Sequence, residues 1–301
     1  MFDNILVCCD GSEQSLQATR LAAALARRHP CRITLLYVLN LNAIIPPSIG
    51  EWAGPAGPRA VAHYQDRVRV AIEQPAAKLL CEAGVEYQWR LVIGHPVEKI
   101  PEVAREIGAD LIVLGNRGLG MLKRTLLGSV SDGVLHHAPC SVLIVRGENA
   151  PHGAAGFEHI LFASDGSESA DRAGEAAVAM AQAFATSLRA LHVVEPFAFG
   201  PVLSDEDYAL MTTTDPEVVA KHYLDHLRSS MRALIAANGV YCTFHQARGD
   251  AEETIVRFAD EQNSDLIVMG SRGLGGFERM LLGSVSTYVA HYAHCPILIV
   301  R

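Results

Sequence analysis

Two glycine- and serine-rich segments, each directly after a short apolar run, have the composition of an anion-binding loop. GNRGLGMLKRTLLGSVS spans residues 115–131, and GSRGLGGFERMLLGSVS spans residues 270–286. Both follow the pattern G-x2-G-x9-G-S, occupied by Gly115, Gly118, Gly128 and Ser129 and then by Gly270, Gly273, Gly283 and Ser284. Glycine lets the backbone come close to a ligand, and free N–H groups at a helix start attract anions. The two segments therefore predict two phosphate-binding loops.

Backbone N–H groups and hydroxyls would supply the hydrogen-bond donors of these loops. We expect the donors at Gly128, Ser129, Val130 and Ser131, and at the matching Gly283, Ser284, Val285 and Ser286. No lysine precedes the serine, so the pattern is not the catalytic G-x4-G-K-[ST] phosphate loop. The residues by themselves leave a second interpretation open, in which the glycines only shape a long turn and the serines only cap a helix.

The loops belong to a repeat of the whole chain with an offset of 155 residues. NILVCCDGSEQS from Asn4 aligns with HILFASDGSESA from His159, and DLIVLGNRG from Asp110 aligns with DLIVMGSRG from Asp265. The two glycine segments are identical at 12 of 17 positions. We therefore expect two homologous domains, residues 1–147 and 157–301, joined by a Gly/Ala/Pro-rich linker at residues 148–156.

Strand and helix patterns alternate within each copy. In the first copy, β-rich runs at 5–9, 32–39, 86–93, 111–114 and 142–145 are separated by helical segments at 13–28, 60–82, 97–107 and 129–137. This alternation predicts an α/β fold in which a parallel sheet carries helices on both faces. Ligands bind beyond the carboxyl ends of such strands, where Asp10, Val38 and the glycine loop should meet.

Composition and charge exclude several classes of protein. The chain is 50% hydrophobic and 19% charged, which is typical of a soluble globular protein. It has no apolar run of the roughly 18 residues that span a membrane and no export-signal pattern, so we expect a cytoplasmic protein without membrane contact. The seven cysteines include no C-x-x-C pair, which predicts free thiols. A net charge of −8 without a dense basic run argues against nucleic-acid binding.

Three features together resemble the universal stress protein (UspA-like) family in its tandem form: the glycine pattern followed by V-S, the Asp-Gly-Ser after the first strand, and CPILIV near the end. The resemblance covers essentially all 301 residues. It implies two doubly wound, Rossmann-like domains of the adenine nucleotide α-hydrolase type, with five strands each in the order 3-2-1-4-5, and ATP binding. The first copy departs from the family pattern at Cys140-Ser141, away from the expected site.

Carried over by position, the resemblance implies one ATP site per domain. Asp10 and Val38 would meet the adenine, Gly115 the ribose, and Gly118, Gly128, Ser129 and Val130 the phosphates. The second site would use Asp165, Val193, Gly270, Gly273, Gly283, Ser284 and Val285. From the residues alone, Asp10 is equally a turn or helix-capping acid, and a valine such as Val38 is more often a core residue than a ligand contact.

The arginines of the loops and the histidines of the second copy are weaker indicators of a binding site than the glycine loops. Four arginines of the loops are secondary candidates, placed to meet either phosphate or solvent: Arg117, Arg272, Arg124 and Arg279. His222 and His226 have the i, i+4 spacing of metal ligands but no third ligand nearby, so we expect no protein metal site. Mg²⁺ or Mn²⁺ would arrive with the nucleotide, since phosphates and water hold such ions.

The expected function is ATP-binding regulation of a stress response, through a nucleotide-dependent conformation or contact with an unidentified protein partner. The alternative is a slow ATPase or a phosphoryl-transfer enzyme. Phosphoryl transfer needs a residue that orients the nucleophile, and the repeated acid is assigned to the adenine end. We therefore expect binding without catalytic residues. The family resemblance also implies pairing at the exposed edge of the last strand, so we expect an intramolecular pseudo-dimer, with homodimerisation as a further alternative.

Overall fold

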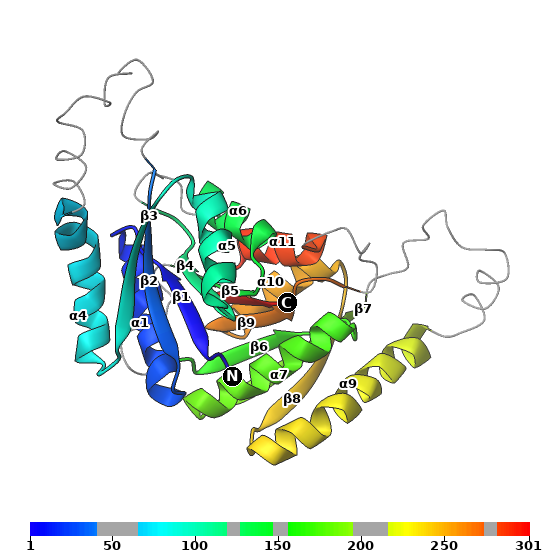
Figure 1. Cartoon of the computed structure of the whole chain (residues 1–301). Coiled ribbons are helices and arrows are strands. Elements are labelled where there is room, and N and C mark those ends of the chain that lie inside the picture. The colour runs from blue at the N-terminus through cyan, green and yellow to red at the C-terminus, as the bar shows by residue number, and fades with distance from the viewer. Residues whose placement is uncertain (41–65, 119–126, 147–155, 195–215, 274–281) are drawn as a thin grey trace. The chain divides into compact units, whose positions relative to one another are not determined.

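The fold is described from a computed structural model of the chain, drawn in Figure 1. The structure describes residues 1–40, 66–118, 127–146, 156–194, 216–273 and 282–301, without the side chains of 216–223 and 226. The chain divides into two compact units, Met1–Gly156 and Phe157–Arg301. Each unit is an α/β unit built on a parallel sheet, which confirms the predicted fold class.

The first unit alternates strands and helices. Its elements are β1 (Asn4–Cys8), α1 (Glu13–Arg28), β2 (Arg32–Leu39), the π-helical turn η1 (Arg69–Glu73), α4 (Gln74–Glu82), β3 (Tyr87–Ile93), α5 (Pro96–Ile107), β4 (Leu111–Gly115), α6 (Ser129–His137) and β5 (Ser141–Val145). The strand order is β3-β2-β1-β4-β5, and all neighbouring strands are parallel. This is the order that the family resemblance implies.

The second unit repeats this arrangement. Its elements are β6 (His159–Ala163), α7 (Glu168–Phe184), β7 (Ser187–Val194), α9 (Pro216–Asn238), β8 (Cys242–Arg248), α10 (Ala251–Glu261), β9 (Leu266–Gly270), α11 (Ser284–Tyr292) and β10 (Ile297–Val300). The strand order is β8-β7-β6-β9-β10, again with parallel neighbours. The offset of 155 residues therefore relates two copies of one topology.

Helices cover both faces of each sheet. In the first unit α1 packs against β4 and α4, whereas α5 packs against β2 and α6 (Figure 1). The five residues of β4 and of β5 are all buried, which is why these strands read as continuous apolar runs. The predicted helix at 60–82 is helical from residue 66 onward, and its first six residues lie outside the described part of the chain.

The first strand of each unit creates the place where a ligand can bind. β1 pairs with β2 on one side and with β4 on the other. The strand order therefore changes direction at β1, with β2 and β3 on one side and β4 and β5 on the other. Such a switch point opens a crevice at the carboxyl edge. Ser12 starts α1 there, because its hydroxyl accepts a hydrogen bond from the N–H of Ser15 at 3.2 Å. No helix in the described ranges is both long and apolar enough to cross a membrane.

Candidate functional site

The first unit has a cavity of about 440 Å³ at the carboxyl edge of its sheet. All nine residues predicted for the first site line it: Asp10, Val38, Gly115, Arg117, Gly118, Gly128, Ser129, Val130 and Ser131. The remaining lining residues, which the sequence patterns did not single out, are Cys8, Cys9, Ser15, Leu36, Tyr37, Pro96, Ile100 and Leu114. The structure therefore brings the predicted residues together from β1, β2, β4 and the start of α6.

The start of α6 forms the polar end of the cavity. Gly128 is the N-cap residue, so this helix has no side-chain cap from its N-cap position. α1 differs, because Ser12 caps it. The N–H of Gly128 itself donates to the carbonyl oxygen of Asn116 at 2.8 Å. The N–H groups of the first helical turn, from Ser129 onward, are thus the ones oriented to meet an anion.

Gly128 also has a steric role, because the two ends of the glycine loop come together at this residue. A Cβ on Gly128 would lie 3.1 Å from the carbonyl oxygen of Asn116 and 3.5 Å from the Cα of Arg117. The first distance is tighter than an ordinary Cβ contact, whereas the second is an ordinary van der Waals contact. Glycine at this position therefore permits the loop to close on the start of α6.

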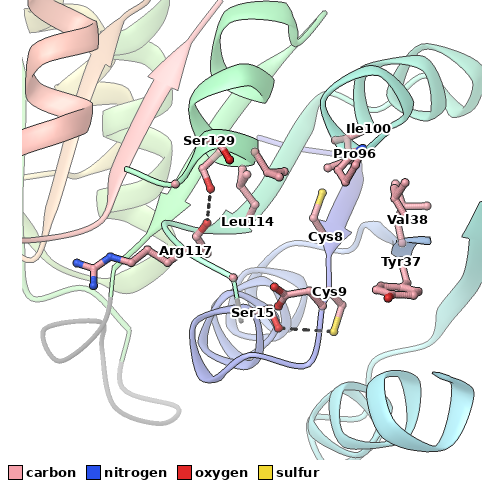
Figure 2. A pocket seen from close by; sticks show the side chains of 17 residues that line it. Cys8, Cys9, Ser15, Tyr37, Val38, Pro96, Ile100, Leu114, Arg117 and Ser129 are labelled. Carbon is pink, nitrogen blue, oxygen red and sulfur yellow. Dashed lines mark hydrogen bonds between the residues drawn. The ribbon is translucent and has the colours of Figure 1, made fainter. Parts of the chain in front are cut away.

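Ser131 connects the start of α6 to the end of β4 by a side-chain hydrogen bond. It is buried, at 4% exposure, and its hydroxyl donates to the carbonyl oxygen of Gly115 at 2.8 Å. A serine hydroxyl has one proton to donate, so in this arrangement Ser131 fixes the end of β4 relative to α6. Ser129 is the hydroxyl that Figure 2 labels at this end of the cavity.

Gly115 is required by packing. A Cβ on this residue would lie 2.8 Å from Cβ and 2.9 Å from the carbonyl carbon of Gln14, so α1 could not approach β4 as it does. The predicted ribose contact of Gly115 stays a prediction beside this structural role.

Asp10 binds the turn that follows β1. Its Oδ1 accepts hydrogen bonds from the N–H of Ser12 at 3.0 Å and from the hydroxyl of Ser12 at 2.6 Å. Its Oδ2 lies against Gly118, inside the space that a Cβ would need. The turn role that the sequence left open is therefore present, while Ser12 caps α1, and Asp10 also lies in the cavity wall.

Apolar and uncharged side chains form the other end of the cavity. Figure 2 shows Cys8 between Val38 on one side and Pro96 and Ile100 of α5 on another, with Tyr37 beside Val38. Burial, and then the nearby negative groups, raise the pKa of the Cys8 thiol well above its ordinary value. Burial raises the pKa of Cys9 as well, and its sulfur contacts the Ser15 hydroxyl at 3.9 Å. Both thiols are neutral at pH 7, so this end suits a flat uncharged group.

Arg117 lies in the cavity wall and points away from the apolar end (Figure 2). In Figure 2 its guanidinium points away from Cys8, Val38 and the other labelled side chains at the apolar end. Its carbonyl oxygen lies 3.5 Å from the hydroxyl of Ser12, which ties the glycine loop to the start of α1. Arg124 and Arg279 lie outside the described residues.

The second unit repeats these relationships. The hydroxyl of Ser286 donates to the carbonyl oxygen of Gly270 at 2.9 Å, and a Cβ on Gly273 would lie 2.6 Å from Oδ2 of Asp165. Gly283 is the N-cap of α11, which has no side-chain cap either. The remaining predicted residues fall at matching positions: Val193 in β7, Arg272 beside Gly273, and Ser284 and Val285 in the first turn of α11.

The two units differ at the apolar end of the site. His192 stands where the first unit has Tyr37; it is buried, and its Nδ1 lies 2.9 Å from the carbonyl oxygen of Ser164. Cys8 and Cys9 correspond to Ala163 and Ser164. The residues at the polar end of the site are thus more similar between the two units than those at the apolar end.

Within the described part of the chain, no group of three or more His, Cys, Asp or Glu side chains is placed to hold a metal ion. The side chains of His222 and His226 lie outside it. All seven cysteines are free.

Comparison with known proteins gives consistent matches over both units. The chain is 32% identical over 304 residues to a universal stress protein of Mycolicibacterium smegmatis, which covers 99% of this chain and 96% of that protein. A universal stress protein of Synechocystis is 34% identical over 151 residues, which is 48% of this chain and 98% of that protein.

A solved universal stress protein of Archaeoglobus fulgidus shares the fold, with a TM-score of 0.70 at 24% identity over 99% of this chain and 98% of that one. Residues 1–146 and 156–301 each match the universal stress protein family. The chain therefore belongs to the universal stress protein family and carries two of its domains in tandem.

Proposed function

We propose that each unit binds one ATP molecule at the carboxyl edge of its sheet, and that nucleotide occupancy regulates a contact with a protein partner in a stress response. The observation that carries this proposal is the gathering of all nine predicted first-site residues around one cavity. Its volume, about 440 Å³, lies within the range of roughly 300–1,000 Å³ that is typical of small-molecule sites.

The two ends of the cavity suggest how the nucleotide lies. The neutral wall around Cys8, Val38 and Pro96 would take the adenine, and the first turn of α6 would take the phosphates. Because the carboxylate of Asp10 lies against Gly118 and would repel phosphate, we place Gly118 at the ribose and not at the phosphates. This refines the assignment that follows from the family resemblance.

Binding without hydrolysis is the form of the proposal that the geometry favours. Among the described residues that line the cavity, Asp10 is the one carboxylate, and its Oδ1 is engaged by Ser12. Phosphoryl transfer needs a group that orients the attacking nucleophile. Mg²⁺ or Mn²⁺ would be held by the phosphates and by water, with a serine hydroxyl such as that of Ser129 within reach of the bound group.

Two measurements test this function. Mass spectrometry of the small molecules released from freshly purified protein should identify ATP, and release of a different class of ligand would contradict the proposal. Single-turnover assays with labelled ATP should show no hydrolysis above background. Hydrolysis that disappears in Gly128→Ala and Gly283→Ala would establish the alternative of a slow ATPase.

A further inference from the structure

The second unit has another cavity, between α9 and the edge strand β8. It has a volume of about 590 Å³ and is lined by residues of the last three turns of α9 and of the start of β8. The cavity therefore lies at the amino-terminal edge of the sheet, whereas the glycine loop lies at the carboxyl edge. Figure 1 shows α9 running beside β8 in this unit. Arg228, Ser229, Arg232, Ala236 and Gly239 are exposed, so the cavity is an open groove on the surface of the unit.

The lining combines two cationic side chains with an apolar surface. Arg228 and Arg232 lie one turn apart on the same face of α9, and Ile235, Val240 and Phe244 supply the apolar part. The guanidinium carbon of Arg228 lies 5.8 Å from the centroid of the Phe244 ring, close enough for a cation–π contact.

The remaining polar groups do not cancel this cationic character. Among the described side chains, Arg228 has one ion-pair contact, from Nη1 to Oδ1 of Asp225 at 3.5 Å, and both side chains of that pair are about half exposed. The Cys242 thiol contacts the carbonyl oxygen of Thr243, and burial raises its pKa to about 12. It is therefore uncharged at neutral pH and does not repel an anion.

The corresponding place in the first unit has a different chemistry. By the offset of 155 residues, Glu73 stands where the second unit has Arg228, and Tyr87 stands where it has Cys242. Glu73 is 5% exposed and accepts hydrogen bonds from Nε of Arg69 at 2.9 Å and from the Tyr87 hydroxyl at 3.2 Å. The second unit thus has a thiol in place of a ring and a cation in place of an anion.

We propose that the cavity between α9 and β8 binds an organic anion with a carboxylate head and an apolar body. The head would pair with Arg228 and Arg232, and the body would lie on Val240 and Phe244. The unit as a whole is acidic, with 10 basic and 19 acidic side chains in residues 149–301, so the two arginines are needed for an anion to bind there. This site is independent of the nucleotide sites.

Decanoate is a suitable ligand for the test, with decanol and decyltrimethylammonium as neutral and cationic counterparts. Isothermal titration of the full chain should show that decanoate binds and that the other two do not at the same concentrations. The double variant R228Q/R232Q should weaken decanoate binding at least about tenfold, because both charge-assisted contacts are lost. Arg257→Gln is a matched control on α10, where Arg257 is exposed and paired with Glu261 at 3.8 Å, and it should bind as the wild type does.

Cys242→Tyr, which introduces the residue of the first unit, should abolish decanoate binding by filling the cavity. R228Q/R232Q changes only surface side chains. If Cys242→Tyr disturbs folding, decanoate binding by R228Q/R232Q still tests the proposal. Absence of decanoate binding to the wild type, or equal binding by R228Q/R232Q, would overturn the proposal. ATP affinity should be unchanged in both variants, so failure of this site and failure of the nucleotide sites are distinguishable.

Discussion

Asp10 and Gly118 are in direct contact across the mouth of the first site, since Oδ2 of Asp10 occupies the space where a side chain at residue 118 would begin. The same relationship joins Asp165 to Gly273, where the distance from Oδ2 to a Cβ would be 2.6 Å. The acid after the first strand and the second glycine of the loop are therefore one structural unit, although more than 100 residues separate them in sequence.

Gly118→Ala should weaken ATP binding in the first unit by about tenfold or more, because the new methyl group must displace either Asp10 or the loop. Asp10→Ala removes the obstacle, so Gly118→Ala should have much less additional effect in an Asp10→Ala background. Titration of the two single variants and the double variant gives this coupling directly. Purely additive effects on ATP affinity would show that the contact has no role in binding.

Gly128→Ala and Gly283→Ala should differ in severity. A Cβ at residue 128 would lie 3.1 Å from the nearest backbone oxygen, whereas one at residue 283 would lie 3.5 Å from its counterpart. We expect about a tenfold loss of ATP affinity for Gly128→Ala and about threefold or less for Gly283→Ala. Each is measured in a chain whose other site is blocked by Gly273→Val or Gly118→Val, with thermal unfolding as the folding control. The reverse order of severity would contradict this steric account.

Much of the fold was predictable because its strands are buried on both faces and its helices have clear starts. β2 and α1 occur at the predicted residues, Arg32–Leu39 and Glu13–Arg28. β1 begins one residue earlier than predicted, at Asn4, a polar residue that is buried because its side-chain amide donates to the carbonyl oxygens of Ile107 and Gly108. Apolar patterning cannot reveal a strand end that a distant backbone stabilises.

The site was predictable in its residue types but not in its internal contacts. Ser131 was expected to donate to phosphate, and in the structure its hydroxyl donates to Gly115. The bond from the N–H of Gly128 to Asn116 closes the loop, and no local pattern indicates it. The sequence predicted only that Ile100 lies in a helical segment and that Pro96 lies directly before it. Their spacing of four residues places both on the face of α5 that lines the cavity.

The two sites should differ in affinity for electrostatic reasons. Residues 1–148 carry 15 basic and 14 acidic side chains, whereas residues 149–301 carry 10 and 19. An ATP anion should therefore bind more tightly to the first unit at low salt, and the difference should shrink as salt screens the charges. Titrations of the two single-site variants at low and high ionic strength measure both effects. Equal affinities at low salt would contradict the prediction.

His245 should make the stability of the second unit depend on pH. Burial, and then the positive charge of Arg189, lower the pKa of His245 below its ordinary value of 6.5. The unfolded chain therefore binds the proton more readily, so the free energy of unfolding should fall as the pH drops through 6.5. His245→Gln should flatten this part of the profile. Chemical unfolding at several pH values tests it, and an unchanged slope in the variant would rule out His245 as the source.

The most direct test of the account is the stoichiometry of ATP binding to the full chain by isothermal titration. The wild type should bind two ATP molecules per chain, and Gly118→Val and Gly273→Val should each bind one. The double variant should bind none while retaining the circular dichroism spectrum of the wild type. One ATP per wild-type chain, or full binding by the double variant, would contradict a nucleotide site in each unit.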